Sequence, residues 1–185
     1  MSSMIYFNKV RDVKSPTQAY NYPAGTDFYV PNYNQKFKHD LIERNHNTDE
    51  YNLFAKPDSD VMTITVMPHG QINIPSGIRV EITNKDSCLL AVNKSGVATK
   101  LRLDVAASLV DADYHGEITL SLTNTSDHPI SFNTGDKLLQ FVNLPVIYPI
   151  FAEVLDEDYN KLVVPSDRGD KGFGSSDKYY LTYCC

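Results

Sequence analysis

The sequence predicts an all-β protein, built as a sandwich or as a barrel. From residue 61 to residue 147, short runs alternate apolar and polar side chains with the period of two that half-buried strands have. Turn residues separate these runs at short intervals, as at Pro68-His69-Gly70. No amphipathic pattern of helical period extends over about 12 residues. Together the three observations are typical of an all-β fold with many short strands.

Each strand is identified by its own run of apolar residues. The strands expected, in chain order, are residues 4–10, 61–66, 71–74, 78–82, 88–92, 118–123, 130–132 and 138–147. The run 88–92 is apolar throughout, which predicts a buried strand with Cys88 as a small core residue. Residues 93–100 predict a turn that leads into a short helical stub.

Residues 32–60 differ from their surroundings, because they are polar and have no sustained period of either kind. They include His39 and His46 among several carboxylates, so metal binding has to be considered. No pair in this stretch has the ligand spacing of a zinc motif. The interpretation favoured is a solvated surface insertion.

Length and composition predict one domain with an appended arm. We expect a β-domain over residues 1–152, with the insertion at about 32–60, followed by an acidic linker, an arm and a short tail over 153–185. The formal net charge of −6 at pH 7 argues against a nucleic-acid surface. Three cysteines without metal spacing and a polar N-terminus indicate a cytoplasmic protein with no membrane segment.

The stretch from Ser108 to Asn124 is expected to form a hairpin around which the site is built. Its second half alternates as a half-buried strand, and its first half places Asp111, Asp113 and Tyr114 in a short turn. A carboxylate at the mouth of such a hairpin is partly desolvated and still meets water, which suits a general base. Aspartates are also ordinary turn formers, and taken alone this stretch favours that simpler interpretation.

The glycine-rich stretch 168–176 is the second candidate for chemistry. It contains one arginine, one aromatic ring and two hydroxyl groups. Glycine-rich loops bring backbone N–H groups close to phosphates, and arginine adds bidentate recognition. As an isolated motif it is weak and is more typical of a flexible tail.

Five separated stretches, taken in order, resemble the motifs of the trimeric dUTP diphosphatase (dUTPase) family. They are Ala24-Gly25-Thr26-Asp27-Phe28-Tyr29, Lys94-Ser95-Gly96-Val97-Ala98, Val110-Asp111-Ala112-Asp113-Tyr114-His115-Gly116, Gly135-Asp136-Lys137-Leu138-Leu139-Gln140 and Arg168-Gly169-Asp170-Lys171-Gly172-Phe173-Gly174-Ser175. The resemblance implies a dUTPase-like β-barrel or jelly-roll-like sandwich with a flexible C-terminal arm. It also implies a homotrimer that converts dUTP to dUMP and pyrophosphate.

The resemblance assigns a role to each matched position. Asp111 corresponds to the carboxylate that activates the attacking water, and Tyr114 to the tyrosine that packs under the deoxyribose. The backbone around Ser108, Leu109 and Thr119 is expected to pair with the uracil edge. The phosphate-binding residues implied are Lys94, Ser95, Gly96 and Gln140, and the arm residues that close over the nucleotide are Arg168, Phe173, Gly174, Ser175 and Ser176. Mg²⁺ is expected to be held by the triphosphate and water, without direct protein ligands.

The chain departs from the family pattern at several positions. Lys94 stands where the family usually has arginine, and Asp27, the usual partner of that arginine, is expected to hold Lys94 instead. Ala106 and Ser108 stand at hairpin positions where glycines are usual, and Asp177 stands where another glycine is common.

Two alternative hypotheses remain at this point. A dCTP deaminase on the same fold would need a general-base glutamate in the strand after the hairpin, where this chain has Ser121. A regulatory protein on the same fold would instead use the 32–60 insertion to bind a protein partner.

Overall fold

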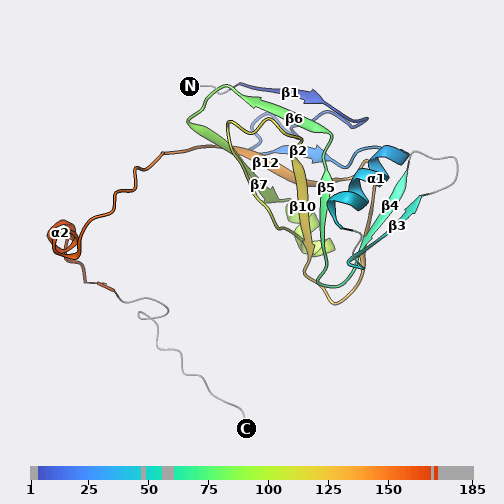
Figure 1. The fold of residues 1–185 in the computed structure, drawn as a ribbon. Coiled ribbons are helices and arrows are strands. Elements are labelled where there is room, and N and C mark those ends of the chain that lie inside the picture. The colour runs from blue at the N-terminus through green and yellow to red at the C-terminus, as the bar shows by residue number, and fades with distance from the viewer. Residues whose placement is uncertain (1–3, 47–48, 56–60, 168, 171–185) are drawn as a thin grey trace, which may run out of the picture. The chain divides into compact units, whose positions relative to one another are not determined.

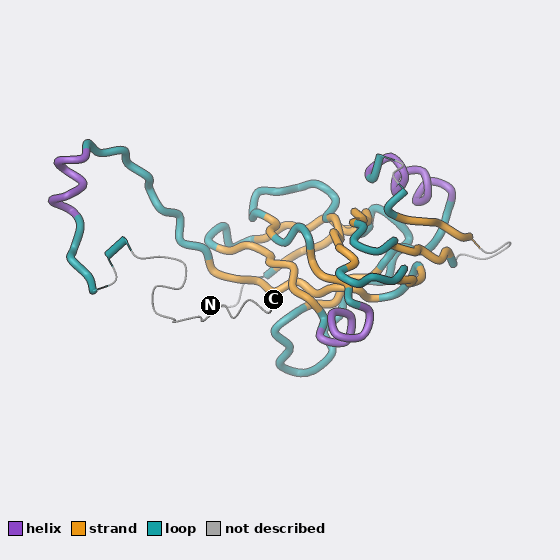
Figure 2. The backbone as a smooth tube through the Cα atoms, turned by 90° about the horizontal axis from the view of Figure 1, so that it is seen from below, coloured by secondary structure: helices purple, strands orange, loops and turns teal. Residues whose placement is uncertain are grey.

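The computed structural model describes residues 4–46, 49–55, 61–167 and 169–170. The chain divides into two compact units, residues 1–148 and residues 149–185. Strands are the main regular secondary structure of the first unit, as Figure 2 shows in orange. The all-β prediction is therefore confirmed.

Twelve strands of the described residues form four antiparallel sheets (Figure 1). The sheets are β1 (Ile5–Lys9) with β6 (Ile78–Ile82); β5 (Gln71–Pro75), β10 (Thr119–Asn124) and β8 (Leu103–Val105); β11 (Ile130–Asn133), β4 (Met62–Val66) and β3 (Tyr51–Ala55); and β2 (Thr26–Tyr29), β12 (Lys137–Pro145), β7 (Ser87–Asn93) and β9 (Leu109–Val110). Among these strands no single ladder closes on itself. The jelly-roll-like form of the prediction is thus the one observed, rather than a closed barrel.

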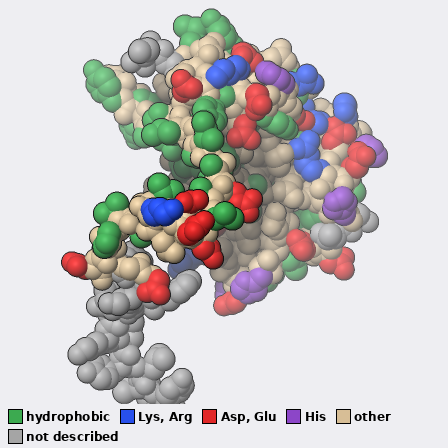
Figure 3. Space-filling view, turned by 60° about the vertical axis from the view of Figure 1, so that its left-hand side comes forward, with side chains coloured by type: hydrophobic (Ala, Val, Ile, Leu, Met, Phe, Trp, Pro, Cys, Tyr) green, Lys and Arg blue, Asp and Glu red, His purple; other side chains and the backbone are tan. Residues whose placement is uncertain are grey.

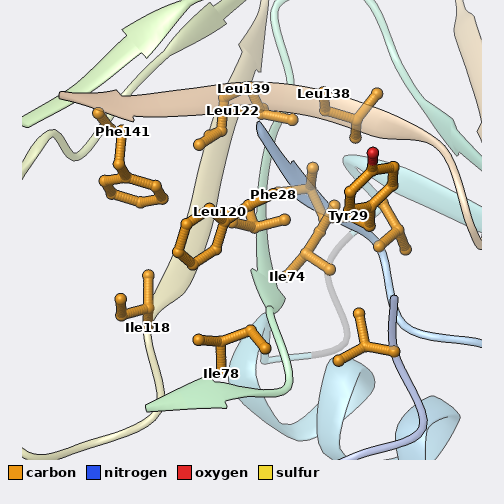
Figure 4. Close-up of a cluster of buried hydrophobic side chains, with 14 of the residues drawn as sticks. Phe28, Tyr29, Ile74, Ile78, Ile118, Leu120, Leu122, Leu138, Leu139 and Phe141 are labelled. Atoms are coloured by element: carbon orange, nitrogen blue, oxygen red, sulfur yellow. The ribbon is translucent and has the colours of Figure 1, made fainter. Parts of the chain in front are cut away.

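The core lies between the sheets and takes the apolar side chains of the alternating strands. Figure 4 shows side chains from β2, β5, β10 and β12 pointing into one cluster. Leu120 and Leu122 are fully buried, and the rings of Phe28 and Phe141 meet edge to face with centroids 4.6 Å apart. Burying one leucine or phenylalanine side chain stabilises the fold by about 1.5–3 kcal/mol. Every second residue of a strand therefore has to be apolar, and this alternation is what identified the strands in the sequence.

The expectation of a solvated insertion at 32–60 is wrong for the part of it that the structure describes. Residues Gln35–Arg44 form helix α1, and the Asn34 side chain caps it by accepting a hydrogen bond from the Phe37 N–H at 2.8 Å. Phe37 and Leu41, one turn apart, are fully buried, and α1 packs against β5 (Figure 1). Two buried apolar side chains anchor this short helix. The sequence therefore shows no sustained helical period of apolar residues there.

The expected hairpin at 108–124 is also corrected. β9 pairs with β7, whereas β10 pairs with β5 and β8, so the two strands belong to different sheets. Residues 111–118 connect them. This connection is longer than a tight hairpin turn and lets the chain pass from one sheet to the other. Other local predictions are confirmed: β1, the buried strand β7 with Cys88, and a single helical turn, η1 (Val97–Leu101).

The second unit contains one described helix, α2 (Asp156–Leu162), which begins with three acidic residues and buries none of its side chains. It falls in the predicted acidic linker. The predicted arm residues Arg168, Phe173, Gly174, Ser175 and Ser176 lie outside the described residues. Within the described part of the chain, no helix is long and apolar enough to span a membrane.

Candidate active site

A first pocket, of about 450 Å³, collects the predicted phosphate-binding residues. Three neighbouring strands build it, because β12 pairs with β2 on one side and with β7 on the other. The pairing sets Gln140 opposite Asp27 and Leu139 opposite Asn93, the last residue of β7. The lining includes Asp27, Lys94, Ser95, Gly96, Lys137 and Gln140. Three sequence stretches far apart in the chain therefore converge here.

Asp27 holds two ammonium groups at the base of this pocket. Lys94 Nζ donates to one carboxylate oxygen, as the sequence predicted, and Lys137 Nζ donates to the other at 2.8 Å. The Asp27 side chain is only 4% exposed. Burial raises its pKa, but the hydrogen bonds from Lys137 and Lys94 outweigh burial, so the pKa lies below its usual value. The same hydrogen bond raises the pKa of Lys137.

Lys137 is the site residue that sequence reasoning missed. It lines the pocket beside Lys94, and its side chain is 46% exposed. The trio of Asp27, Lys94 and Lys137 has a net charge of +1, so the pocket favours an anion. The signal was present in the sequence, since Lys137 lies in one of the five matched stretches, three residues before Gln140.

Backbone N–H groups add to this positive character. The turn after β7 is closed by the N–H groups of Val97 and Ala98, which both donate to the Lys94 carbonyl at 2.9 Å. Within the described part of the chain, the N–H groups of Ser95 and Gly96 donate to no protein acceptor. Such amides are suited to phosphate oxygens.

A second, smaller pocket of about 210 Å³ brings together the predicted nucleoside-binding residues. Its lining is Ala107, Leu109, Val110, Asp111, Tyr114, Ile118, Thr119 and Phe141. Ser108 is not part of it, because its carbonyl accepts a hydrogen bond from the Ala91 N–H at 2.6 Å and so joins β7. The structure thus places Asp111, Tyr114, Leu109 and Thr119 together, without Ser108.

Asp111 lies in a turn that is held at both ends. The Tyr114 N–H donates to the Asp111 carbonyl at 3.2 Å, and Lys85 Nζ donates to the Ala112 carbonyl at 2.9 Å. The Tyr148 hydroxyl in turn donates to the Lys85 carbonyl at 2.5 Å. The Asp111 side chain is exposed and makes no hydrogen bond within the described residues. The Asp111 carboxylate is therefore open to solvent within one chain, and the partial desolvation expected at the mouth of a hairpin is not observed there.

The two pockets have no lining residue in common. The cationic pocket with Lys94 and Lys137 and the pocket with Asp111 are thus separate features of one chain. On the face that Figure 3 shows, Lys and Arg side chains lie among Asp and Glu side chains and form no continuous basic stripe.

The fold defines the class first: the chain is an all-β, jelly-roll-like protein whose structural neighbours are phage dUTPases. One is a mutant dUTPase of Staphylococcus bacteriophage 80alpha with dUpNHpp, which is 19% identical and has a TM-score of 0.66, with 95% of this chain and 99% of that chain covered. Another is a mutant dUTPase from phage phi11 of S. aureus, described with a structural Mg(II) ion, at 18% identity and a TM-score of 0.57, covering 82% and 96% of the two chains.

Residues 59–177 match the dUTPase family model, and the chain belongs to the dUTPase family. A curated relative, the deoxyuridine 5'-triphosphate nucleotidohydrolase of Shewanella baltica, is 34% identical over 116 residues, which cover 62% of this chain and 72% of the relative. The resemblance predicted from the five motifs is therefore confirmed.

Proposed function

We propose that this protein hydrolyses dUTP to dUMP and pyrophosphate, with Asp111 activating the water that attacks the α-phosphorus. Family membership supports the reaction, since the curated relatives are deoxyuridine 5'-triphosphate nucleotidohydrolases. The observation on which the mechanism rests is the small pocket that holds Asp111 beside Tyr114. An unpaired carboxylate that lines a cavity beside a tyrosine suits a general base for this reaction.

In the nucleoside pocket, Tyr114 supports the deoxyribose, and the backbone around Leu109 and Thr119 faces the uracil. Ser108 supports this wall through its bond to Ala91. In the cationic pocket, the phosphates are bound by Lys94, the Ser95 and Gly96 amides, Gln140 and Lys137. Gln140 lies against Gly25, where a Cβ would stand 2.5 Å from its side-chain oxygen, so glycine there keeps this side chain in place.

We further propose that the active assembly is a homotrimer. The cationic pocket and the Asp111 pocket share no lining residue within one chain, which is consistent with a site that residues of a second copy complete. The arm residues Arg168, Phe173, Gly174, Ser175 and Ser176 are proposed to close over the nucleotide, with the Phe173 ring on the uracil.

The trimer gives the first prediction. Multi-angle light scattering at assay concentrations should give a mass of about three chains, because both pockets are needed for one complete site. A monomer that retains full activity would contradict it.

Mg²⁺ is proposed to reach the site on the triphosphate, where it neutralises phosphate charge. The residues fit this assignment, because both Asp27 oxygens are occupied by lysines. Among the described residues, the cluster with metal-ligand geometry is His39, Asp40 and Glu43 on α1, where Asp40 already pairs with Arg11 and Lys36. No direct protein ligand is therefore assigned.

The test of the function is pyrophosphate release from dUTP, dTTP, dCTP and UTP, each with Mg²⁺ and with excess EDTA. We expect hydrolysis of dUTP in strong preference to the other three, and loss of activity with EDTA. No release from dUTP by the full chain would overturn the proposal.

The deaminase alternative is disfavoured by Ser121. This residue is fully buried, and its hydroxyl donates to Asn73 Oδ1 at 2.6 Å. A buried serine whose hydroxyl is already hydrogen-bonded to Asn73 cannot replace the general-base glutamate of a deaminase.

The 32–60 segment stays available to a regulatory partner, because α1 buries only Phe37 and Leu41 and the side chains of His39 and Glu43 are 78% and 76% exposed. A second, binding role would coexist with catalysis.

Tyr114→Ala should let the enzyme accept UTP. Sugar discrimination is proposed to come from the bulk of the ring, so its removal should lower the dUTP-to-UTP ratio of kcat/KM by about tenfold or more. Steady-state kinetics with both substrates measures this ratio. An unchanged ratio would place sugar selection elsewhere, and Tyr6→Ala, at a 59% exposed position of β1 outside both pocket linings, is the matched control.

Lys94→Arg and Lys94→Ala test the departure from the family pattern. Lys94→Ala should raise the KM for dUTP, because a cation near the triphosphate is removed. Lys94→Arg should be tolerated, because a guanidinium offers two N–H donors to phosphate or to Asp27. Equal losses in both variants would mean that the pocket is shaped around the smaller ammonium group.

A further inference from the structure

Glu117 has an unusually complete set of hydrogen bonds for a side chain that lines neither pocket. Arg11 Nε donates to its Oε1 at 2.6 Å and Arg11 Nη2 to its Oε2 at 2.9 Å, a two-pronged arginine–carboxylate pair. The Gly77 N–H donates to Oε1 at 2.7 Å. The Glu117 side chain is 13% exposed and that of Arg11 10% exposed, so water screens this pair little.

The backbone of Glu117 holds the tyrosine of the nucleoside pocket. The Tyr114 hydroxyl donates to the Glu117 carbonyl at 3.1 Å. The Tyr114 ring lies against Gly116, where a Cβ would stand 2.3 Å from the hydroxyl oxygen. The position of the Tyr114 ring therefore depends on the backbone positions of Gly116 and Glu117.

Helix α1 extends this network to the other wall of the pocket. Arg11 Nη1 donates to Asp40 Oδ2 at 2.7 Å. Arg44 Nη1 donates to Thr119 Oγ1 at 2.5 Å, and Arg44 Nη2 lies 3.7 Å from Glu117 Oε2. Residues 117 and 119, on either side of buried Ile118, are thus both fixed from outside the pocket.

We propose that Arg11 and Glu117, assisted by Asp40 and Arg44 of α1, are positioning residues that hold Tyr114 in place and so set the selectivity for deoxyribose over ribose. The proposal rests on the proposed function, in which Tyr114 supports the sugar. It gives α1 a role in catalysis by the chain itself rather than in binding a partner. None of these four residues belongs to the five matched motifs.

The experiment measures kcat and KM for dUTP and UTP in wild type, Arg11→Met, Glu117→Gln and the double variant. Each single variant should lower the dUTP-to-UTP ratio of kcat/KM by about tenfold, because small misplacements of a positioning group are costly. The double variant should lower it no further than the singles, since both act through one pair. Arg11→Lys, which keeps one charged donor, should restore part of the ratio.

The control is Ile64→Ala in β4, in the sheet of β11, β4 and β3, a fully buried position outside both pocket linings. It should lower thermal stability and leave the ratio unchanged. A ratio within about twofold of wild type in both single variants, or an equal drop in Ile64→Ala, would overturn the proposal. If Arg11→Met does not fold, Arg11→Lys and Arg44→Gln take its place in the test. A lower dUTP-to-UTP ratio of kcat/KM in both variants supports the proposal. An unchanged ratio in either variant overturns it.

The result also separates the two proposals. Wild-type protein that releases pyrophosphate from dUTP, with variants of unchanged ratio, overturns the positioning role alone. Wild-type protein without this activity overturns the proposed function and the positioning role together.

Discussion

Asp111→Asn should keep the fold and nucleotide binding and lower kcat for dUTP by at least about 100-fold, the lower end of what general-base catalysis contributes. The amide is nearly the same size as the carboxylate but cannot take the proton from water. Folding should be unaffected, because within the described residues the Asp111 side chain makes no hydrogen bond and the turn is held by backbone contacts.

Asp113→Asn is the matched control, since Asp113 is an exposed carboxylate two residues away in the same turn. Its kcat should stay within about twofold of wild type. Single-turnover kinetics with dUTP measures the chemical step in both variants. Near-normal turnover in Asp111→Asn, or a larger loss in Asp113→Asn, would contradict the assignment of the base.

Asp27→Ala should be the most destabilising substitution of a charged residue in the cationic pocket. Breaking a buried ion pair typically costs 3–5 kcal/mol, because the partner charge is left uncompensated. Lys94 and Lys137 are partly exposed, at 21% and 46%, so water relieves them in part. We expect a loss of about 3 kcal/mol in the free energy of unfolding at pH 7, measured by urea titration.

The loss should depend on pH in a defined direction. The pKa of Asp27 is lower in the folded protein than its ordinary value of 3.8, so its contribution is present above that value. It declines as the pH falls below 3.8 and through the lower folded pKa. Wild type and Asp27→Ala should therefore converge in acid.

The surface pair of Asp127 and His69 supplies the control. Its atoms lie 3.1 Å apart, and the Asp127 side chain is 89% exposed. Asp127→Ala should change the free energy of unfolding by no more than about 0.5 kcal/mol at pH 7. Equal effects of the two substitutions would mean that Asp27 contributes no more than a surface charge.

The sequence by itself determined the family and most of the strands, although β2, β3 and β8 were not predicted. Strand positions follow from alternation, because a side chain of a half-buried strand points either to the core or to water. Lys94 beside Asp27 was also predicted, from the order of the motifs and the usual pairing of those two positions.

Only the tertiary structure decided how these parts meet. Helix α1 stayed hidden because Phe37 and Leu41 are its two buried residues, too few to make a periodic pattern. The hairpin prediction was wrong because β9 pairs with β7 and β10 pairs with β5, in different sheets. Both pairings join strands that are distant in the chain. Arg11 and Glu117 lie 106 positions apart. Contacts of this kind are made by folding and leave no local pattern, so the network that holds Tyr114 could be found only in three dimensions.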